Sequence, residues 1–168
     1  MYIIEAIRRT KENKNLKRRC IRHIVKSDNI EKDISILKEI VKQQGEPGMW
    51  RIYRTVNRRD SKRAMKVLQH RMIEENIHDR LESAWKTALL QRESRSEDLF
   101  LLDIDSNSLT DFMRVRNILE ENNIQEIESE ITPNGHHIVV KSVDSRLFKD
   151  LEYVEIKRDA LLFLRIIE

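Results

Sequence analysis

The sequence predicts an α+β protein built from two lobes that together form one domain. Apolar residues recur at helical spacing in some stretches and alternate as in strands in others along the 168 residues. The charge is divided unevenly: residues 1–97 contain 24 lysines and arginines against 14 acidic residues, and residues 98–168 contain 8 against 15. The predicted order of helices and strands also changes at this boundary. We therefore predict a basic N-terminal α/β lobe over 1–97 and an acidic second lobe over 98–168.

Composition excludes several classes of protein. Charged residues make up 36% and apolar residues 39% of the chain, which is typical of a folded protein rather than a disordered one. No apolar run approaches the roughly 20 residues that a membrane-spanning helix needs, and the first residues lack the apolar core of a signal peptide. No membrane partner is therefore expected. The single cysteine, Cys20, cannot form an internal disulfide and fits the reducing cytoplasm, where we expect the protein to reside.

The first lobe is predicted to have the order α-β-α-β-α. Tyr2–Thr10 has isoleucines at the spacing of a short amphipathic helix, and the polar, basic stretch Lys11–Arg19 is expected to be a loop. The remaining elements are a strand over Cys20–Lys26, a helix with an N-cap at Ser27-Asp28 and an end at Gly45–Gly48, a strand over Met49–Asn57, and a helix that starts at Asp60 or Ser61, with an interruption expected near Asn76–Asp79.

The second lobe is predicted to have the order β-α-β-β-α-β-β. This order resembles the RRM-like, or ferredoxin-like, split β-α-β unit with one extra hairpin strand. The expected elements are a buried strand over Leu99–Asp105, a helix capped within Ser106–Ser108, a strand over Ile124–Thr132, a turn at Pro133–Gly135, a return strand over His136–Lys141, a helix or turn over Asp144–Leu151, and strands over Tyr153–Lys157 and Leu161–Ile167.

Asp103 and Asp105, at the end of the strand Leu99–Asp105, are the leading candidates for a metal site. Side chains of a strand repeat every second residue, so both carboxylates are expected on one face. Two such carboxylates repel each other unless a cation or a proton lies between them, and Mg²⁺ and Mn²⁺ prefer oxygen ligands. Glu155 would lie nearby if the split β-α-β order holds, which would assemble three carboxylates for phosphoryl transfer. The alternative is that the two aspartates simply face solvent.

Three short motifs follow one another in the second lobe. Phe100–Asp105 is an apolar run that ends in Asp-x-Asp, Thr132–His137 is a glycine-containing turn that leads to a histidine, and Tyr153–Asp159 is an apolar strand with acidic residues. Together they resemble the three motifs of the archaeo-eukaryotic primases and primase-polymerases. The resemblance covers about the whole chain, and it implies a small N-terminal α/β lobe packed against an RRM-like lobe with the active site between them.

The resemblance implies a metal-dependent nucleotidyltransferase similar to a minimal DNA primase or primase-polymerase core, acting in nucleic-acid replication or repair. Its cofactor would be Mg²⁺ or Mn²⁺ and its substrates a nucleoside triphosphate and single-stranded or primed nucleic acid, with a helicase or another replication protein as a candidate partner. The implied residues are Asp103, Asp105 and Glu155 as catalytic metal ligands, and His137, His136, Lys157 and Asn134 as nucleotide-binding residues. The family more often has aspartate where this chain has Glu155, so Asp159 is an alternative third ligand.

A group of basic residues at the end of the strand Met49–Asn57 is a candidate for binding phosphates. Arginine guanidinium groups bind phosphate oxygens in a bidentate manner, and an aromatic side chain such as Tyr53 or Trp50 could stack on a base. The alternative is that Trp50 belongs to the core and the arginines are solvated. The residues predicted to contact nucleic acid or phosphate are Arg51, Arg54, Asn57 and Arg58.

Two other classes of protein share part of this pattern. Phosphatases of the haloacid dehalogenase type also have an apolar run before Asp-x-Asp, but they need threonine or valine where this chain has Asn107, and a parallel sheet rather than hairpins. The second class is a non-catalytic nucleotide or nucleic-acid binding protein on a degenerate primase-like fold. A typical RNA-binding sheet carries a pair of aromatic residues on its central strands, and in this sequence Phe100 is the only candidate for that pair.

Overall fold

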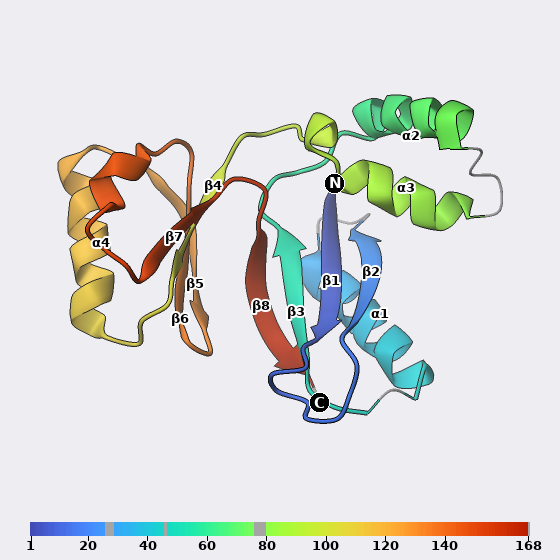
Figure 1. Ribbon diagram of the computed structural model, residues 1–168, viewed down its shortest axis with the longest axis horizontal. Coiled ribbons are helices and arrows are strands. Elements are labelled where there is room, and N and C mark those ends of the chain that lie inside the picture. The colour runs from blue at the N-terminus through green and yellow to red at the C-terminus, as the bar shows by residue number, and fades with distance from the viewer. Residues whose placement is uncertain (26–28, 46, 76–79, 168) are drawn as a thin grey trace.

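The computed structural model describes residues 1–25, 29–45, 47–75 and 80–167, and it has an α+β fold with two antiparallel sheets. Figure 1 shows the helix α4 (Leu109–Glu121) on the outer side of the second sheet, and the helices α1 (Ile30–Gln43), α2 (Ser61–Glu75) and α3 (Leu81–Leu90) around the first sheet. Each sheet has four strands. Their order in the first sheet is β2 (Arg19–Val25), β1 (Tyr2–Arg8), β3 (Trp50–Thr55) and β8 (Leu161–Ile167). In the second sheet it is β5 (Glu126–Thr132), β6 (Gly135–Val140), β4 (Phe100–Ile104) and β7 (Val154–Lys157). The α+β class expected from the sequence is therefore confirmed.

The first sheet begins with two strands rather than with the helix expected for Tyr2–Thr10. The isoleucines in this stretch lie on both faces of β1: Ile4 packs in one core cluster and Ile3 in another. A strand buried on both faces is apolar nearly throughout, and over a short stretch this pattern is compatible with helical spacing as well. The strands of this sheet are β1 (Tyr2–Arg8), β2 (Arg19–Val25), β3 (Trp50–Thr55) and β8 (Leu161–Ile167).

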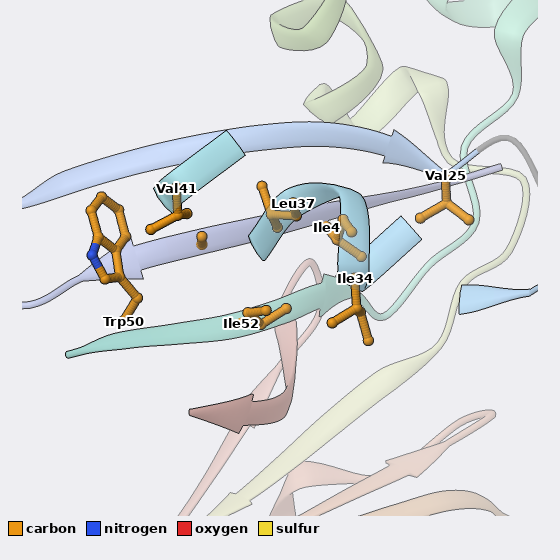
Figure 2. Close-up of a cluster of buried hydrophobic side chains, with 8 residues drawn as sticks. Ile4, Val25, Ile34, Leu37, Val41, Trp50 and Ile52 are labelled. Carbon is orange, nitrogen blue, oxygen red and sulfur yellow. The ribbon is translucent and has the colours of Figure 1, made fainter. Parts of the chain in front are cut away.

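The helix α1 (Ile30–Gln43) covers one face of the first sheet (Figure 2). Its N-cap is Asn29, whose side-chain oxygen accepts a hydrogen bond from the backbone N–H of Lys32 at 3.2 Å; the expected cap at Ser27-Asp28 lies outside the described residues. Trp50 is a member of this core, as the alternative interpretation held. The buried cluster consists of Ile4, Ala6, Val25, Ile34, Leu37, Val41, Trp50 and Ile52.

Two further helices, α2 (Ser61–Glu75) and α3 (Leu81–Leu90), pack together and against the opposite face of the first sheet, through Ile3. Asp60 begins α2, because its Oδ1 accepts hydrogen bonds from the backbone N–H groups of the next turn. The expected interruption near Asn76–Asp79 lies outside the described residues. A short 3₁₀ helix, η1 (Arg92–Ser94), follows α3.

The second sheet has the strand order of a split β-α-β unit. Its central strands β4 and β6 lie side by side, with β7 and β5 at the edges, and α4 covers the face that carries Leu102 and Ile104. The second helix of such a unit is reduced here to one 3₁₀ turn. The elements are β4 (Phe100–Ile104), α4 (Leu109–Glu121), β5 (Glu126–Thr132), β6 (Gly135–Val140), η2 (Ser145–Phe148) and β7 (Val154–Lys157).

The last strand lies in the first sheet, although the sequence placed it in the second lobe. β8 pairs antiparallel with β3 and forms the edge of the first sheet that is nearest the second sheet (Figure 1). The physical reason is that Leu162 is fully buried between the sheets, against side chains of both. The division at residues 97 and 98 therefore separates the two sheets only as far as β7. The inter-sheet cluster consists of Val56, Leu101, Val139, Ala160 and Leu162.

Asn57 fastens the two segments of chain that pass between the sheets. Its Nδ2 donates to the carbonyl oxygens of Leu99 at 3.2 Å and Arg158 at 3.0 Å, and its Oδ1 accepts from the N–H of Leu99 at 2.7 Å. The side chain is fully buried. Because these bonds satisfy backbone groups on both connections, Asn57 sets the relative position of the two sheets.

Candidate functional site

A cavity of about 540 Å³ lies between the two sheets and contains most of the residues predicted to act together. The second sheet and its loops contribute what we call the carboxylate wall, which comprises Asp103, Asp105, His137 and Lys157. The first sheet and its loop contribute what we call the basic wall, which comprises Arg9, Lys11, Arg18 and Arg51. Asn134 and Thr132 lie at the rim that belongs to the second sheet, and Tyr53 and Phe163 line the side of the first sheet.

Strand register brings the carboxylate wall together. Asp103 on β4 lies opposite His137 on β6 and opposite Glu155 on β7, so the three side chains share one face of the sheet. Lys157 lies two residues beyond Glu155 on the same face. The alternation predicted for this strand is thus confirmed: Leu102 and Ile104 face α4, and Asp103 faces the cavity.

His137 links the carboxylate wall to the first sheet through its two ring nitrogens. Its Nδ1 accepts a hydrogen bond from the backbone N–H of Phe163 on β8 at 3.1 Å. A backbone N–H can only donate, so the ring proton lies on Nε2, which is 3.2 Å from Oδ1 of Asp103. The imidazole therefore bridges β8 and β4, and it positions the carboxylate of Asp103.

Lys157 provides the counter-charge for the carboxylates. Its Nζ lies 2.6 Å from Oδ2 of Asp103 and 2.8 Å from Oε2 of Glu155. The hydrogen bond from His137, followed by that from Lys157, outweighs desolvation and lowers the pKa of Asp103 to about 2. Burial opposes the charge of Lys157, but its hydrogen bonds to the two carboxylates raise its pKa above the ordinary value. Asp103 is thus ionised and neutralised by a neighbour on β7.

The expected set of three carboxylates does not assemble as a metal site. Within the described ranges, no group of three or more histidine, cysteine or acidic side chains is placed to hold a metal ion. The side chain of Glu155 is 68% exposed and is not part of the cavity lining, because the ammonium of Lys157 lies between it and Asp103. Asp159 is no substitute: its carboxylate pairs with the buried Arg59 at 2.6 Å.

Two carboxylates remain as potential metal ligands, Asp103 and Asp105, which both line the cavity. Asp105 is exposed, and its backbone N–H donates to the carbonyl of Tyr153 at 2.9 Å, which fixes the end of β4. Mg²⁺ is commonly bound in proteins by one or two carboxylates together with substrate phosphates and water. The residues present therefore fit an ion that a phosphate ligand helps to hold, rather than an ion held by protein groups alone.

The two histidines after the turn have different surroundings. His136 is not part of the cavity lining and stacks on Phe112 of α4, with ring centroids 4.2 Å apart, so it does not share a site with His137. The alternation of a strand separates it from His137. Asn134 does line the cavity. Gly135 permits this turn, because a Cβ there would lie only 1.9 Å from the carbonyl oxygen of Ile104.

The four residues predicted to bind phosphate on and after β3 do not form one group. Arg51 lines the cavity, and its guanidinium pairs with Glu12 at 2.5 Å. Arg54 and Arg58 instead line a second cavity of about 740 Å³ beside α1. There Arg54 lies 4.3 Å from the centre of the Tyr2 ring. Asn57, as described above, is a buried link between the sheets and not a phosphate ligand.

Sequence reasoning missed Arg9, Lys11 and Arg18, which reach the cavity from the loop between β1 and β2. The signal was present, since that loop is strongly basic, but it gives no indication of which structure it faces. With these residues the cavity has five basic side chains against two acidic ones. This balance favours an anionic ligand.

Comparisons with known proteins add no family to this description. No protein-family model matches the chain, and no curated protein has a significantly similar sequence. Among the described helices, none is both long enough and apolar enough to cross a membrane.

Proposed function

We propose that this protein is a metal-dependent nucleotidyltransferase with a primase-like catalytic core, acting on nucleic acid in replication or repair. The observation that carries the proposal is the cavity between the sheets, where two aspartates, a lysine and a histidine face four basic side chains. A nucleoside triphosphate complexed with Mg²⁺ or Mn²⁺ offers the matching chemistry, because its phosphates need cations and its metal ion needs oxygen ligands.

Asp103 and Asp105 are the proposed metal ligands, completed by the phosphates of the nucleotide. When bound, the ion would neutralise charge on the α-phosphate and favour attack by a 3′-hydroxyl group. His137 acts as a positioning residue, since both of its ring nitrogens are engaged within the protein. The protein contributes positioning and electrostatic stabilisation, and it needs no nucleophile of its own.

Lys157 has the central place in this proposal. In the structure its ammonium neutralises Asp103 and Glu155, at 2.6 Å and 2.8 Å. A bound nucleotide brings a metal ion for Asp103 and phosphate oxygens for Lys157. Asp103 would then bind the metal ion, and Lys157 would bind the phosphates, in place of their ion pair with each other. The nucleotide and the ion are then expected to bind cooperatively, because neither alone provides both new partners.

A second candidate is a protein that binds a nucleotide without catalysis. The specific observation in its favour is the same ion pair, because Lys157 satisfies Asp103 without a metal. The described part of the chain also has no cluster of three metal ligands. In this case the cavity would bind the anionic nucleotide through its excess of basic side chains.

Incorporation of labelled nucleotides by the full chain tests the proposal, with Mn²⁺ or Mg²⁺ and with or without a primed template. The wild type should incorporate nucleotide only with metal, and Asp103→Asn should lower the rate at least about 100-fold, which corresponds to the loss of one strong electrostatic contact in the transition state. Asp98→Asn is the matched control, because Asp98 is an exposed acid that pairs with Arg95 outside the cavity. Equal activity of Asp103→Asn and wild type would contradict the proposal. Nucleotide binding without any incorporation would favour the second candidate.

A further inference from the structure

We infer that the loop between β1 and β2 is a polyphosphate clamp, in which Lys11 and Arg18, assisted by Arg9, bind the terminal phosphates of the nucleotide. This inference rests on the proposed nucleotide site and assigns its triphosphate end to a loop of the first sheet. The three side chains line the cavity from the side opposite the carboxylate wall. They were not among the residues expected to bind phosphate.

The start of the loop is held in place by a buried asparagine. Nδ2 of Asn13 donates to the carbonyl oxygens of Arg9 and Met49, both at 2.9 Å, and its Oδ1 accepts from the N–H of Met49 at 2.7 Å. Gly48 makes room for this side chain: its φ is +105°, and a Cβ there would lie 2.3 Å from Oδ1 of Asn13. Arg9 and Lys11 therefore extend from a fixed turn.

The end of the loop is anchored by a second buried side chain. Nε and Nη2 of Arg8 donate to the carbonyl oxygen of Lys17 at 3.2 Å and 3.1 Å, and Nη1 donates to that of Pro47 at 2.9 Å. The guanidinium lies 5.3 Å from the centre of the Trp50 ring. Arg18, which follows Lys17, is thus presented from an ordered backbone. Such preorganisation lowers the entropy lost on binding.

The charges on the loop are incompletely paired. Glu12 accepts from Arg51 at 2.5 Å and lies 3.8 Å from Arg9. In the described part of the chain, Lys11 and Arg18 have no acidic partner. Arg51 has a side chain only 9% exposed, and its Nε is buried without a hydrogen-bond partner, as is Oε2 of Glu12. A buried, partly unsatisfied guanidinium beside free cations is suited to an anion with several oxygens.

The ligand class that fits this loop is a polyphosphate chain. A single phosphate can neutralise only part of the excess of basic side chains, whereas a triphosphate brings several charges along one direction. We therefore expect affinity to rise with the number of phosphates and to depend little on the base. The same dependence should hold for inorganic tripolyphosphate, which has no base or sugar.

Calorimetric titration of the full chain with inorganic tripolyphosphate, without metal, tests the clamp. The wild type should bind tripolyphosphate more tightly than orthophosphate, and the double variant Lys11→Gln/Arg18→Gln should bind it at least about tenfold more weakly, as the loss of two charge-assisted contacts implies. The matched control is Lys14→Gln/Lys17→Gln, which removes two charges from exposed positions of the same loop that do not line the cavity. The control should keep the affinity of the wild type within about twofold. Melting temperatures of both variants verify that they fold.

Each alternative outcome overturns the clamp. These outcomes are no binding of tripolyphosphate by the wild type, equal affinity of Lys11→Gln/Arg18→Gln and wild type, and an equal loss in both double variants, which would show general attraction by a basic surface. The clamp and the catalytic proposal can fail separately. Tripolyphosphate binding that depends on the loop, without nucleotide incorporation, would support the clamp alone; incorporation together with unchanged tripolyphosphate binding in Lys11→Gln/Arg18→Gln would support catalysis alone.

Discussion

The two walls of the cavity differ in how their charges are held. On the carboxylate wall, Asp103 is bound from two sides by His137 and Lys157, at 3.2 Å and 2.6 Å. On the basic wall, Lys11 and Arg18 are exposed and have no acidic partner in the described part of the chain. A fixed wall can position reacting groups, whereas an open wall can capture a ligand before the reaction. Under the proposed function, the second sheet would position the reacting groups and the loop of the first sheet would capture the ligand.

The largest expected effect on stability comes from removing the hydrogen bonds of Asn57, which connect the two sheets. Asn57→Ala removes the three hydrogen bonds that connect both inter-sheet segments, leaves part-buried backbone groups of Leu99 and Arg158 without these partners, and opens a gap at a fully buried position. We expect the free energy of unfolding to fall by about 3–4 kcal/mol, from the three lost bonds and the gap. Urea denaturation measures this change. Asn107→Ala, at an exposed position, is the control, and an equally small loss in both variants would contradict the role of Asn57.

The next effect concerns the histidine that joins the carboxylate wall to β8. His137→Ala should lower the free energy of unfolding by about 3 kcal/mol, because it leaves the N–H of Phe163 unpaired and removes a buried ring. His137→Asn can still accept from Phe163 but cannot reach Asp103, so it should recover part of the stability without recovering nucleotide incorporation. If His137→Asn matched the wild type in incorporation, positioning of Asp103 by His137 would be wrong.

A smaller effect is expected from acid. The pKa of Asp103 is about 2 in the folded protein, below its ordinary 3.8, so ionised Asp103 stabilises the fold above about pH 4. This stabilisation should be lost as the pH falls from about 4 to about 2, and it amounts to about 2 kcal/mol. Urea denaturation at a series of pH values, compared between wild type and Asp103→Asn, measures it. Identical pH dependence of the two proteins would show that the carboxylate is not held as described.

The second sheet could be predicted from the sequence more fully than the first. The strand that carries Asp103 is a short apolar run that ends in Asp-x-Asp, and the turn at Gly135 has an unambiguous residue signal, so the split β-α-β order follows from local patterns. The residue pattern of β1 predicts a helix instead of a strand, because burial of both faces removes the apolar–polar alternation typical of a strand. Local spacing does not predict that β8 belongs to the first sheet, because its pairing with β3 depends on contacts between residues that are distant in the sequence.

The candidate site could be predicted only in part from the sequence. Asp103, Asp105, His137, Lys157 and Asn134 were expected in one site, and they do line one cavity. The exclusion of Glu155 could not be predicted, since it depends on the direction of the Lys157 side chain between two strands. Nor could the sequence show which cations meet the carboxylates, because that depends on how the loop of the first sheet approaches the second.

The central claim is that a metal ion binds here through two aspartates and the phosphates of a nucleotide. The most direct measurement is the melting temperature of the full chain with Mn²⁺, with a non-hydrolysable nucleoside triphosphate, and with both. We predict that the shift with both ligands exceeds the sum of the separate shifts. Asp103→Asn should abolish this excess, and Glu155→Gln should retain it. Full stabilisation by Mn²⁺ alone, or loss of the excess in Glu155→Gln, would contradict the claim and restore a site of three carboxylates.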